Sequence, residues 1–151
     1  MENLEETIRY CKLDDLDNLL QLYRELRPND PEFSGQLAHN CWQALLSQTH
    51  TRIIVADIDG QLASSCQLGV IPTLTNGGKP FGVIEHVITA EAFRRRGLSR
   101  KVLEHALSLA WEMGCYKVML LSGESRHAAH QLYENIGFQS GIERGFVIKP
   151  S

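Results

Sequence analysis

The chain alternates between stretches in which apolar residues recur every three or four positions and stretches in which they recur every second position. The first spacing is that of a helix with one apolar face, and the second is that of a strand with one buried face. In the first half, a short strand pattern at 7–10 precedes two helical patterns, which a proline-containing loop at 27–31 separates. We therefore predict helices over residues 14–26, with Asp14 or Asp15 as the cap, and over residues 35–48.

Strand-like alternation follows these two helices. Residues 52–58 and 61–72 alternate on either side of Asp59-Gly60, a dipeptide typical of tight hairpin turns. Phe81 to Thr89 has the same character after a turn-rich segment. The three strands are predicted to form an antiparallel meander.

The second half begins with a strong helical pattern from Leu98 to Met113. Tyr116 to Leu121 is then an unalternated apolar run, typical of a strand in a parallel pair that is covered on both faces. A last helix is predicted over 125–136, ending at Gly137, and a last strand over 144–148. Because no repeat or linker interrupts the pattern, we expect one domain over residues 1–151, of the α/β class and the α+β type.

Composition narrows the classes of function. The chain is 43% hydrophobic and 22% charged, with a formal net charge of −3, which is ordinary for a globular domain. No apolar run is long enough to cross a membrane and the acidic start lacks a signal core, so we expect a cytoplasmic protein with no membrane partner. The acidic balance argues against nucleic acid as a partner. The four cysteines have neither metal-site nor disulfide spacing and are interpreted as buried free thiols.

Basic residues gather at one place, where a strand pattern gives way to a helix. Arg94, Arg95 and Arg96 precede Gly97, and five of the fifteen Lys and Arg residues lie between Arg94 and Lys101. A helix N-terminus carries unsatisfied N–H groups and about half a positive charge, so this combination is typical of a phosphate site. The alternative is a solvated charge run that caps a surface helix, and the stretch alone favours neither.

Glu85 is the candidate for reactive chemistry. By alternation it shares a face with Phe81, Val83 and Val87, where a carboxylate is costly unless it is paired or used. We interpret it as a partly buried general base, and a salt bridge to a neighbouring arginine is the alternative.

The histidines are given no catalytic role. His86 faces the other side of its strand and is interpreted as a core or helix-contacting residue. His127 and His130 stand at helical i, i+3 spacing but have no third ligand in a recognisable pattern, so no metal site is expected.

Three segments, in order, resemble the GCN5-related N-acetyltransferase (GNAT) family, whose members transfer an acetyl group from acetyl-CoA to an amine. They are IEHVITAEAFRRRGLS at 84–99, YKVMLLSG at 116–123 and AAHQLYENIGF at 128–138. The resemblance covers nearly the whole chain. It implies a twisted, mixed and mostly antiparallel sheet of about six to seven strands with about four flanking helices, and acetyl-CoA as co-substrate without a metal.

The resemblance also assigns residues to the co-substrate. The family signature falls on Arg94, Gly97 and Ser99, with serine in place of the usual last Gly or Ala. It implies that the CoA pyrophosphate is bound by the backbone amides of Arg94, Arg95, Arg96, Gly97, Leu98 and Ser99. It further implies that the backbone of Val87, Ile88 and Thr89 holds the pantetheine arm and the thioester carbonyl. The family usually has an asparagine near the start of the last helix that contacts the pantetheine arm. Arg126 stands about there in this chain, so the asparagine's contact is not carried over.

Tyr133 would on its own be interpreted as a core aromatic of the last helix, but it resembles the family tyrosine that faces the CoA sulfur. An amine with a pKa of about 10.4 must lose a proton before it attacks a thioester. Glu85 is expected to take that proton, directly or through water, and Tyr133 to donate to the departing thiolate. Both residues are therefore predicted to be catalytic.

Nothing in the sequence identifies the acceptor. The IEHV segment resembles that of the family's glucosamine-phosphate acetyltransferases, and a small-molecule amine is the first prediction, ahead of a protein or peptide amine. A non-catalytic acetyl-CoA sensor is the alternative from another class. A homodimer is expected through an edge strand near residues 145–149.

Overall fold

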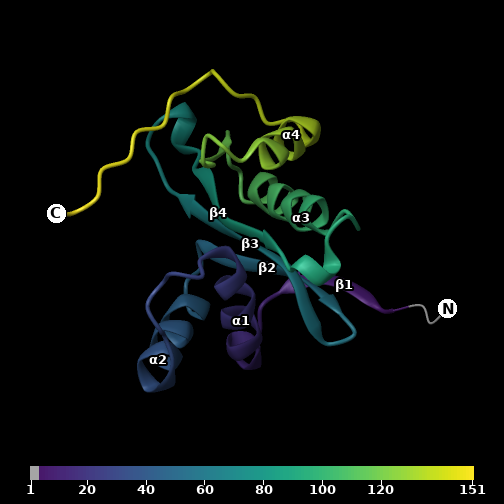
Figure 1. The fold of residues 1–151 in the computed structure, drawn as a ribbon. Coiled ribbons are helices and arrows are strands. Elements are labelled where there is room, and N and C mark those ends of the chain that lie inside the picture. Colours follow the sequence, from purple (N-terminus) through teal and green to yellow (C-terminus); the bar gives the residue numbers. More distant parts are fainter. Residues whose placement is uncertain (1–3) are drawn as a thin grey trace.

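The computed structural model describes residues 4–151, which form one open sheet between two layers of helices (Figure 1). The strands follow one another in space in chain order. They are β1 (Glu6–Tyr10), β2 (Thr51–Ile58), β3 (Gln61–Ile71), β4 (Phe81–Thr89) and β5 (Val118–Leu120). Neighbours from β1 to β4 are antiparallel and β5 is parallel to β4, as the meander and the strand, helix, strand order predict.

Two helices cover each face of the sheet. The helices α1 (Leu16–Leu26) and α2 (Gly35–Leu46) lie on one face, and α3 (Leu98–Glu112) and α4 (His127–Ile136) lie on the other (Figure 1). Short 3₁₀ turns occupy Leu13–Asp15, Asn76–Gly78 and Glu91–Phe93. The mixed α+β architecture that the resemblance implies is confirmed.

The core consists of the apolar stripes that the spacing indicates. On α3 the buried positions are Leu98, Val102, Leu103, Ala106 and Ala110, and they pack against the inward side chains of the strands, including Ile54, Cys66, Leu68 and Ile84. A smaller cluster on the opposite face joins Leu19 and Trp42 to Ile53, Val55 and Leu62. The two faces of β2 are thus buried by different helices.

The prediction of a last strand over residues 144–148 is wrong. Residues 144–148 form no strand, and the sheet has five strands within the described residues rather than six to seven. The pattern in this segment is strand-like, but a strand also needs a paired neighbour, and this one pairs with none of residues 4–151. The strand predicted over 116–121 is likewise shorter, at Val118–Leu120.

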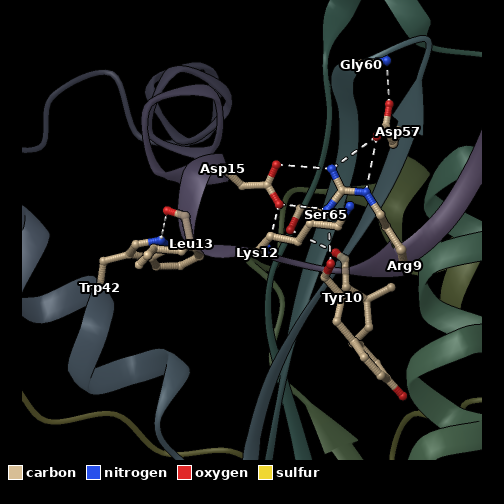
Figure 2. Close-up of polar contacts among 10 residues, drawn as sticks. Arg9, Tyr10, Lys12, Leu13, Asp15, Trp42, Asp57, Gly60 and Ser65 are labelled. Carbon is tan, nitrogen blue, oxygen red and sulfur yellow. Dashed lines mark hydrogen bonds and ion pairs between the residues drawn. The ribbon is translucent and has the colours of Figure 1, made fainter.

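A partly buried ion network holds the start of the chain to the sheet (Figure 2). Arg9 of β1 donates two hydrogen bonds to the carboxylate of Asp15, at 2.7 and 3.0 Å, and two to Asp57 of β2, both at 3.1 Å. The backbone N–H of Lys12 also donates to Asp15, at 2.7 Å. Burial alone would raise the pKa of the Asp15 carboxyl, but the hydrogen bonds from Arg9 and Lys12 outweigh it and hold that pKa below its ordinary value.

We expect Asp15→Asn to lower the free energy of unfolding at pH 7 by about 2–4 kcal/mol, because it leaves the Arg9 charge partly buried without its bidentate partner. A carboxyl whose pKa is depressed on folding stabilises the protein above its unfolded pKa, about 3.9, and loses that contribution as the pH falls through the folded value. Denaturant unfolding from pH 7 to pH 3 should therefore show a difference in the free energy of unfolding between the two proteins, and this difference should decrease as the pH falls toward 3. The exposed neighbour Asp14, changed to Asn, is the control. A difference that is the same at every pH would contradict this account.

Candidate active site

The one parallel pair of strands among residues 4–151 separates soon after it forms. β4 and β5 pair through Gly82, Val83 and Ile84, and β4 then continues to Thr89 without β5 beside it. A cavity of about 230 Å³ lies at this separation. It is lined by Ile84, Glu85, His86 and Val87 of β4, by Leu120, Leu121, Ser122 and Gly123 at and after the end of β5, by Arg126 and Tyr133 near and on α4, and by Leu26 and Arg27 at the end of α1.

A bulge in β4 shapes one wall of this cavity. Ser65 of β3 is opposite Ile88 and Gln67 is opposite Glu85, so Cys66 alone faces both His86 and Val87. His86 has φ of 56°, in the left-handed region that non-glycine residues seldom adopt. Bulges of this kind re-aim side chains, and this one turns Val87 toward the α3 side of the sheet, where it packs with Ile84.

Glu85 lies on the cavity wall, but its predicted partial burial is wrong, because the side chain is exposed. The bulge explains the error, since it removes Val87 from the face that Glu85 shares with the half-buried Phe81 and Val83. Within residues 4–151 no cation forms a salt bridge with Glu85, and Arg27, which lines the same cavity, pairs with Asp30 at 2.8 Å. Among the described residues the Glu85 carboxylate is therefore not held by a salt bridge.

Two rings line the cavity with Glu85, that of His86 on β4 and that of Tyr133 on α4. The half-buried ring of His86 packs against Tyr23 of α1, with ring centroids 5.8 Å apart. Tyr133 of α4 is only 7% exposed and packs edge-on against Phe138. Burial raises the pKa of the Tyr133 phenol above its ordinary value, so the group stays protonated at neutral pH.

The arginine loop leads directly into α3. Gly97 caps that helix with φ of 73°, and Arg95 has φ of 66°. The first helical bond runs from the Lys101 N–H to the Gly97 carbonyl, so the N–H groups of the turn before it are left for another acceptor. In the described part of the chain, Arg94, Arg95 and Arg96 are exposed and form no salt bridge. Donors and unpaired positive charge thus meet at one helix end.

Three hydroxyl groups connect the end of β4 to this helix end. Buried Ser64 of β3 donates to the carbonyl of Ile88 at 2.9 Å, and its oxygen lies 2.8 Å from that of Thr89. The Thr89 hydroxyl is in turn 2.5 Å from that of Ser99 in the first turn of α3. Ser64 was missed by sequence reasoning, because nothing local marks a serine in a buried strand as a partner of residues 24 and 25 positions away.

The predicted site residues therefore fall into two adjoining groups. Glu85, Val87 and Tyr133 line the cavity. Ile88, Thr89 and the residues from Arg94 to Ser99 lie beyond it, at the end of β4 and the start of α3. The side chain of Ile88 is buried against Leu22, which leaves only its backbone for a ligand.

Other candidate sites in the described chain are weaker. A larger cavity, of about 430 Å³, lies between α1 and α2, but none of the predicted site residues lines it. Residues 4–151 contain no cluster of three or more His, Cys, Asp or Glu side chains placed to hold a metal ion. Burial raises the pKa of the Cys66 thiol to about 12 and also raises that of Cys115. Cys41 is exposed, so the prediction that all four thiols are buried is wrong. None of the helices described is both long and apolar enough to span a bilayer.

Comparison with known proteins bears directly on this site. The acetyltransferase (GNAT) family profile matches residues 16–138. A putative acetyltransferase from Agrobacterium tumefaciens has a solved structure that is 40% identical, with a TM-score of 0.91 over 95% of this chain and 99% of that one. A glucosamine 6-phosphate N-acetyltransferase from Trypanosoma brucei brucei is 27% identical over 88% of each chain.

A third comparison concerns the fold alone. An aminoglycoside N-acetyltransferase solved in complex with CoA is 17% identical, with a TM-score of 0.82 over 99% of this chain and 98% of that one. The profile match covers most of the chain and includes β4, the arginine loop and Tyr133. The chain therefore belongs to the acetyltransferase (GNAT) family and is an acetyl-CoA-dependent N-acetyltransferase.

Proposed function

We propose that the protein transfers the acetyl group of acetyl-CoA directly to the primary amine of a small molecule, with Glu85 as general base and Tyr133 as proton or hydrogen-bond donor. One observation carries the proposal. The same cavity of about 230 Å³, where β4 and β5 separate, is lined by an exposed carboxylate from β4 that forms no salt bridge within residues 4–151 and by a protonated phenol from α4.

The residues at the start of α3 suit the phosphates of the co-substrate. Donors and positive charge come from the N–H groups of the first helical turn, from the left-handed Gly97 and from three arginines that form no salt bridge within residues 4–151. The backbone of Val87, Ile88 and Thr89 continues from the cavity toward this helix end and would hold the pantetheine arm. Bound there, acetyl-CoA supplies a thioester carbon for attack.

Glu85 suits the proton transfer that makes an amine reactive. A primary amine with a pKa of about 10.4 is almost fully protonated near pH 7. Because Glu85 is exposed at the cavity and has no salt-bridge partner within residues 4–151, it can accept that proton directly or through water. Positioned bases of this kind accelerate reactions by about 10²- to 10⁴-fold.

Tyr133 suits the leaving group. Its raised pKa keeps the hydroxyl protonated, and that hydroxyl has no hydrogen-bond partner among residues 4–151. A thiol has a pKa of about 8.5, so the thiolate leaves without needing full protonation. Tyr133 therefore acts as a donor to the developing negative charge on sulfur.

The acceptor that we favour is a phosphorylated amino sugar. Arg126 lines the cavity, is exposed and forms no salt bridge within the described residues, so it can pair with a phosphate while the amine reaches Glu85. The Trypanosoma relative, named for glucosamine 6-phosphate, supports this class. A protein or peptide amine and a sensor without catalysis remain as outcomes of the test.

The test is thiol release from acetyl-CoA with a panel of amines at fixed pH. We expect turnover with glucosamine 6-phosphate at a kcat/KM at least about 10-fold above that with unphosphorylated glucosamine, since an arginine–phosphate pair contributes more than 1.4 kcal/mol. Peptides with a free N-terminus or a lysine complete the panel. Release with peptides alone would overturn the small-molecule acceptor, and acetyl-CoA binding without release for any amine would identify a sensor.

A further inference from the structure

A hydroxyl contact joins the end of β4 directly to the start of α3. Thr89 is the last residue of β4, and its hydroxyl oxygen lies 2.5 Å from that of Ser99 in the first turn of α3. The backbone between these two residues takes a longer route, through the 3₁₀ turn Glu91–Phe93 and the exposed arginine loop. The contact therefore connects the strand proposed to hold the pantetheine arm to the helix end proposed to bind the phosphates.

A buried serine on β3 determines the direction of the hydrogen bonds in this contact. Ser64 is fully buried, and its hydroxyl donates to the carbonyl of Ile88 at 2.9 Å and lies 2.8 Å from the hydroxyl of Thr89. Each hydroxyl has one proton to donate. Because Ser64 donates its proton to Ile88, Thr89 must donate to Ser64, and Ser99 must donate to Thr89. The proton of the Ser99 hydroxyl is therefore used within the fold and is not available to a bound phosphate.

The Ser99 side chain is also an addition to the family signature. The signature usually has Gly or Ala at this position, and neither has a hydroxyl. Any residue except proline supplies the backbone N–H that is proposed to bind the pyrophosphate, so that N–H does not explain the serine. What the serine adds is the hydrogen bond to Thr89. Its effect is therefore on where the start of α3 lies relative to β4.

We propose that Ser99 is a positioning residue, whose hydroxyl acts through Thr89 and Ser64 to hold the start of α3 at a fixed place against β4. This rests on the proposed function, in which one acetyl-CoA molecule contacts both elements. A ligand that contacts two groups binds more tightly when both are already held in the geometry that it needs, because less conformational freedom is lost on binding. The hydroxyl chain should therefore favour ligands that span strand and helix, and not ligands that contact the helix end alone.

The test compares two ligands by calorimetric titration of the full chain. CoA has both the phosphates and the pantetheine arm, whereas 3′-phosphoadenosine 5′-diphosphate has the phosphates alone. We expect Ser99→Ala to weaken CoA binding about 3- to 10-fold, the range for one hydrogen bond. Affinity for the phosphate ligand should not change, because the variant keeps every backbone N–H and every arginine. Ser99→Thr restores a hydroxyl and should bind CoA as the unchanged protein does.

Two further variants separate positioning from a general loss of stability. Ser108→Ala is the matched control, because it makes the same substitution at an exposed position of the same helix, and it should change neither affinity. Thr89→Val removes the middle hydroxyl and keeps the shape of the side chain. If the three hydroxyls act as one chain, adding Ser99→Ala to Thr89→Val should weaken CoA binding no further. Denaturant unfolding of each variant measures stability independently of binding.

Three results would overturn the proposal: unchanged CoA binding by Ser99→Ala, an equal loss for both ligands, or additive losses in the double variant. A failure of the proposed phosphate site would be distinguishable from these. In that case the unchanged protein would itself not bind the phosphate ligand, and the positioning role would be excluded with it.

Discussion

Glu85→Gln is expected to lower kcat about 10²- to 10³-fold near neutral pH, because the amine must then lose its proton without a positioned base. Gln keeps the size and polarity of the side chain. Because Glu85 is exposed, we expect the substitution to leave folding unchanged. The loss should shrink as the pH rises toward the pKa of the acceptor amine, since more of that amine is already deprotonated. Affinity for acetyl-CoA should not change.

Steady-state thiol release from pH 6.5 to pH 10, with acetyl-CoA titrated by calorimetry, measures these quantities. Glu112→Gln, at an exposed position at the end of α3, is the control for removing one negative charge. If the Glu85 variant kept its turnover, or lost the same factor at every pH, the general base would have to be another group that lines the cavity. His86 would be the next residue to test, because it lies beside Glu85 on the bulge.

Gly97→Glu is expected to weaken acetyl-CoA binding at least about 100-fold, which corresponds to about 2.8 kcal/mol. The glycine caps α3 with φ of 73°, a conformation that costs other residues about 1–2 kcal/mol. The new carboxylate would also stand where helix N–H groups and three arginines otherwise favour phosphate. Turnover at saturating acetyl-CoA should fall much less than affinity.

Gly114→Glu is a well-matched control. Gly114 follows the other end of α3 with φ of 84°, and neither glycine has atoms within 4 Å of an added Cβ. Both variants therefore add the same side chain to a residue with a positive φ, but only Gly97 lies at the proposed phosphate site. Calorimetric titration should show near-normal affinity for Gly114→Glu. Equal weakening by the two substitutions would mean that helix destabilisation, and not the phosphate site, is responsible.

Much of the fold could be predicted because it depends on local pattern. The apolar stripe of α3, the Asp59-Gly60 hairpin turn and the capping Gly97 each follow from residues within a few positions of one another. The arginine loop is also a local signal, since its three charges and glycine are consecutive. For that reason the position of the helix end and of its basic loop could be predicted correctly.

The sequence by itself determined which residues bear charge and apolar surface, and the tertiary structure decided where those surfaces meet. The β4 bulge exists only through the register with β3, so the exposure of Glu85 could not be predicted from alternation. The contacts that join Ser64, Thr89 and Ser99 depend on the same pairing. Residues 144–148 have a strand pattern, yet they form no strand, because a strand requires hydrogen bonds from a neighbour that no local pattern supplies.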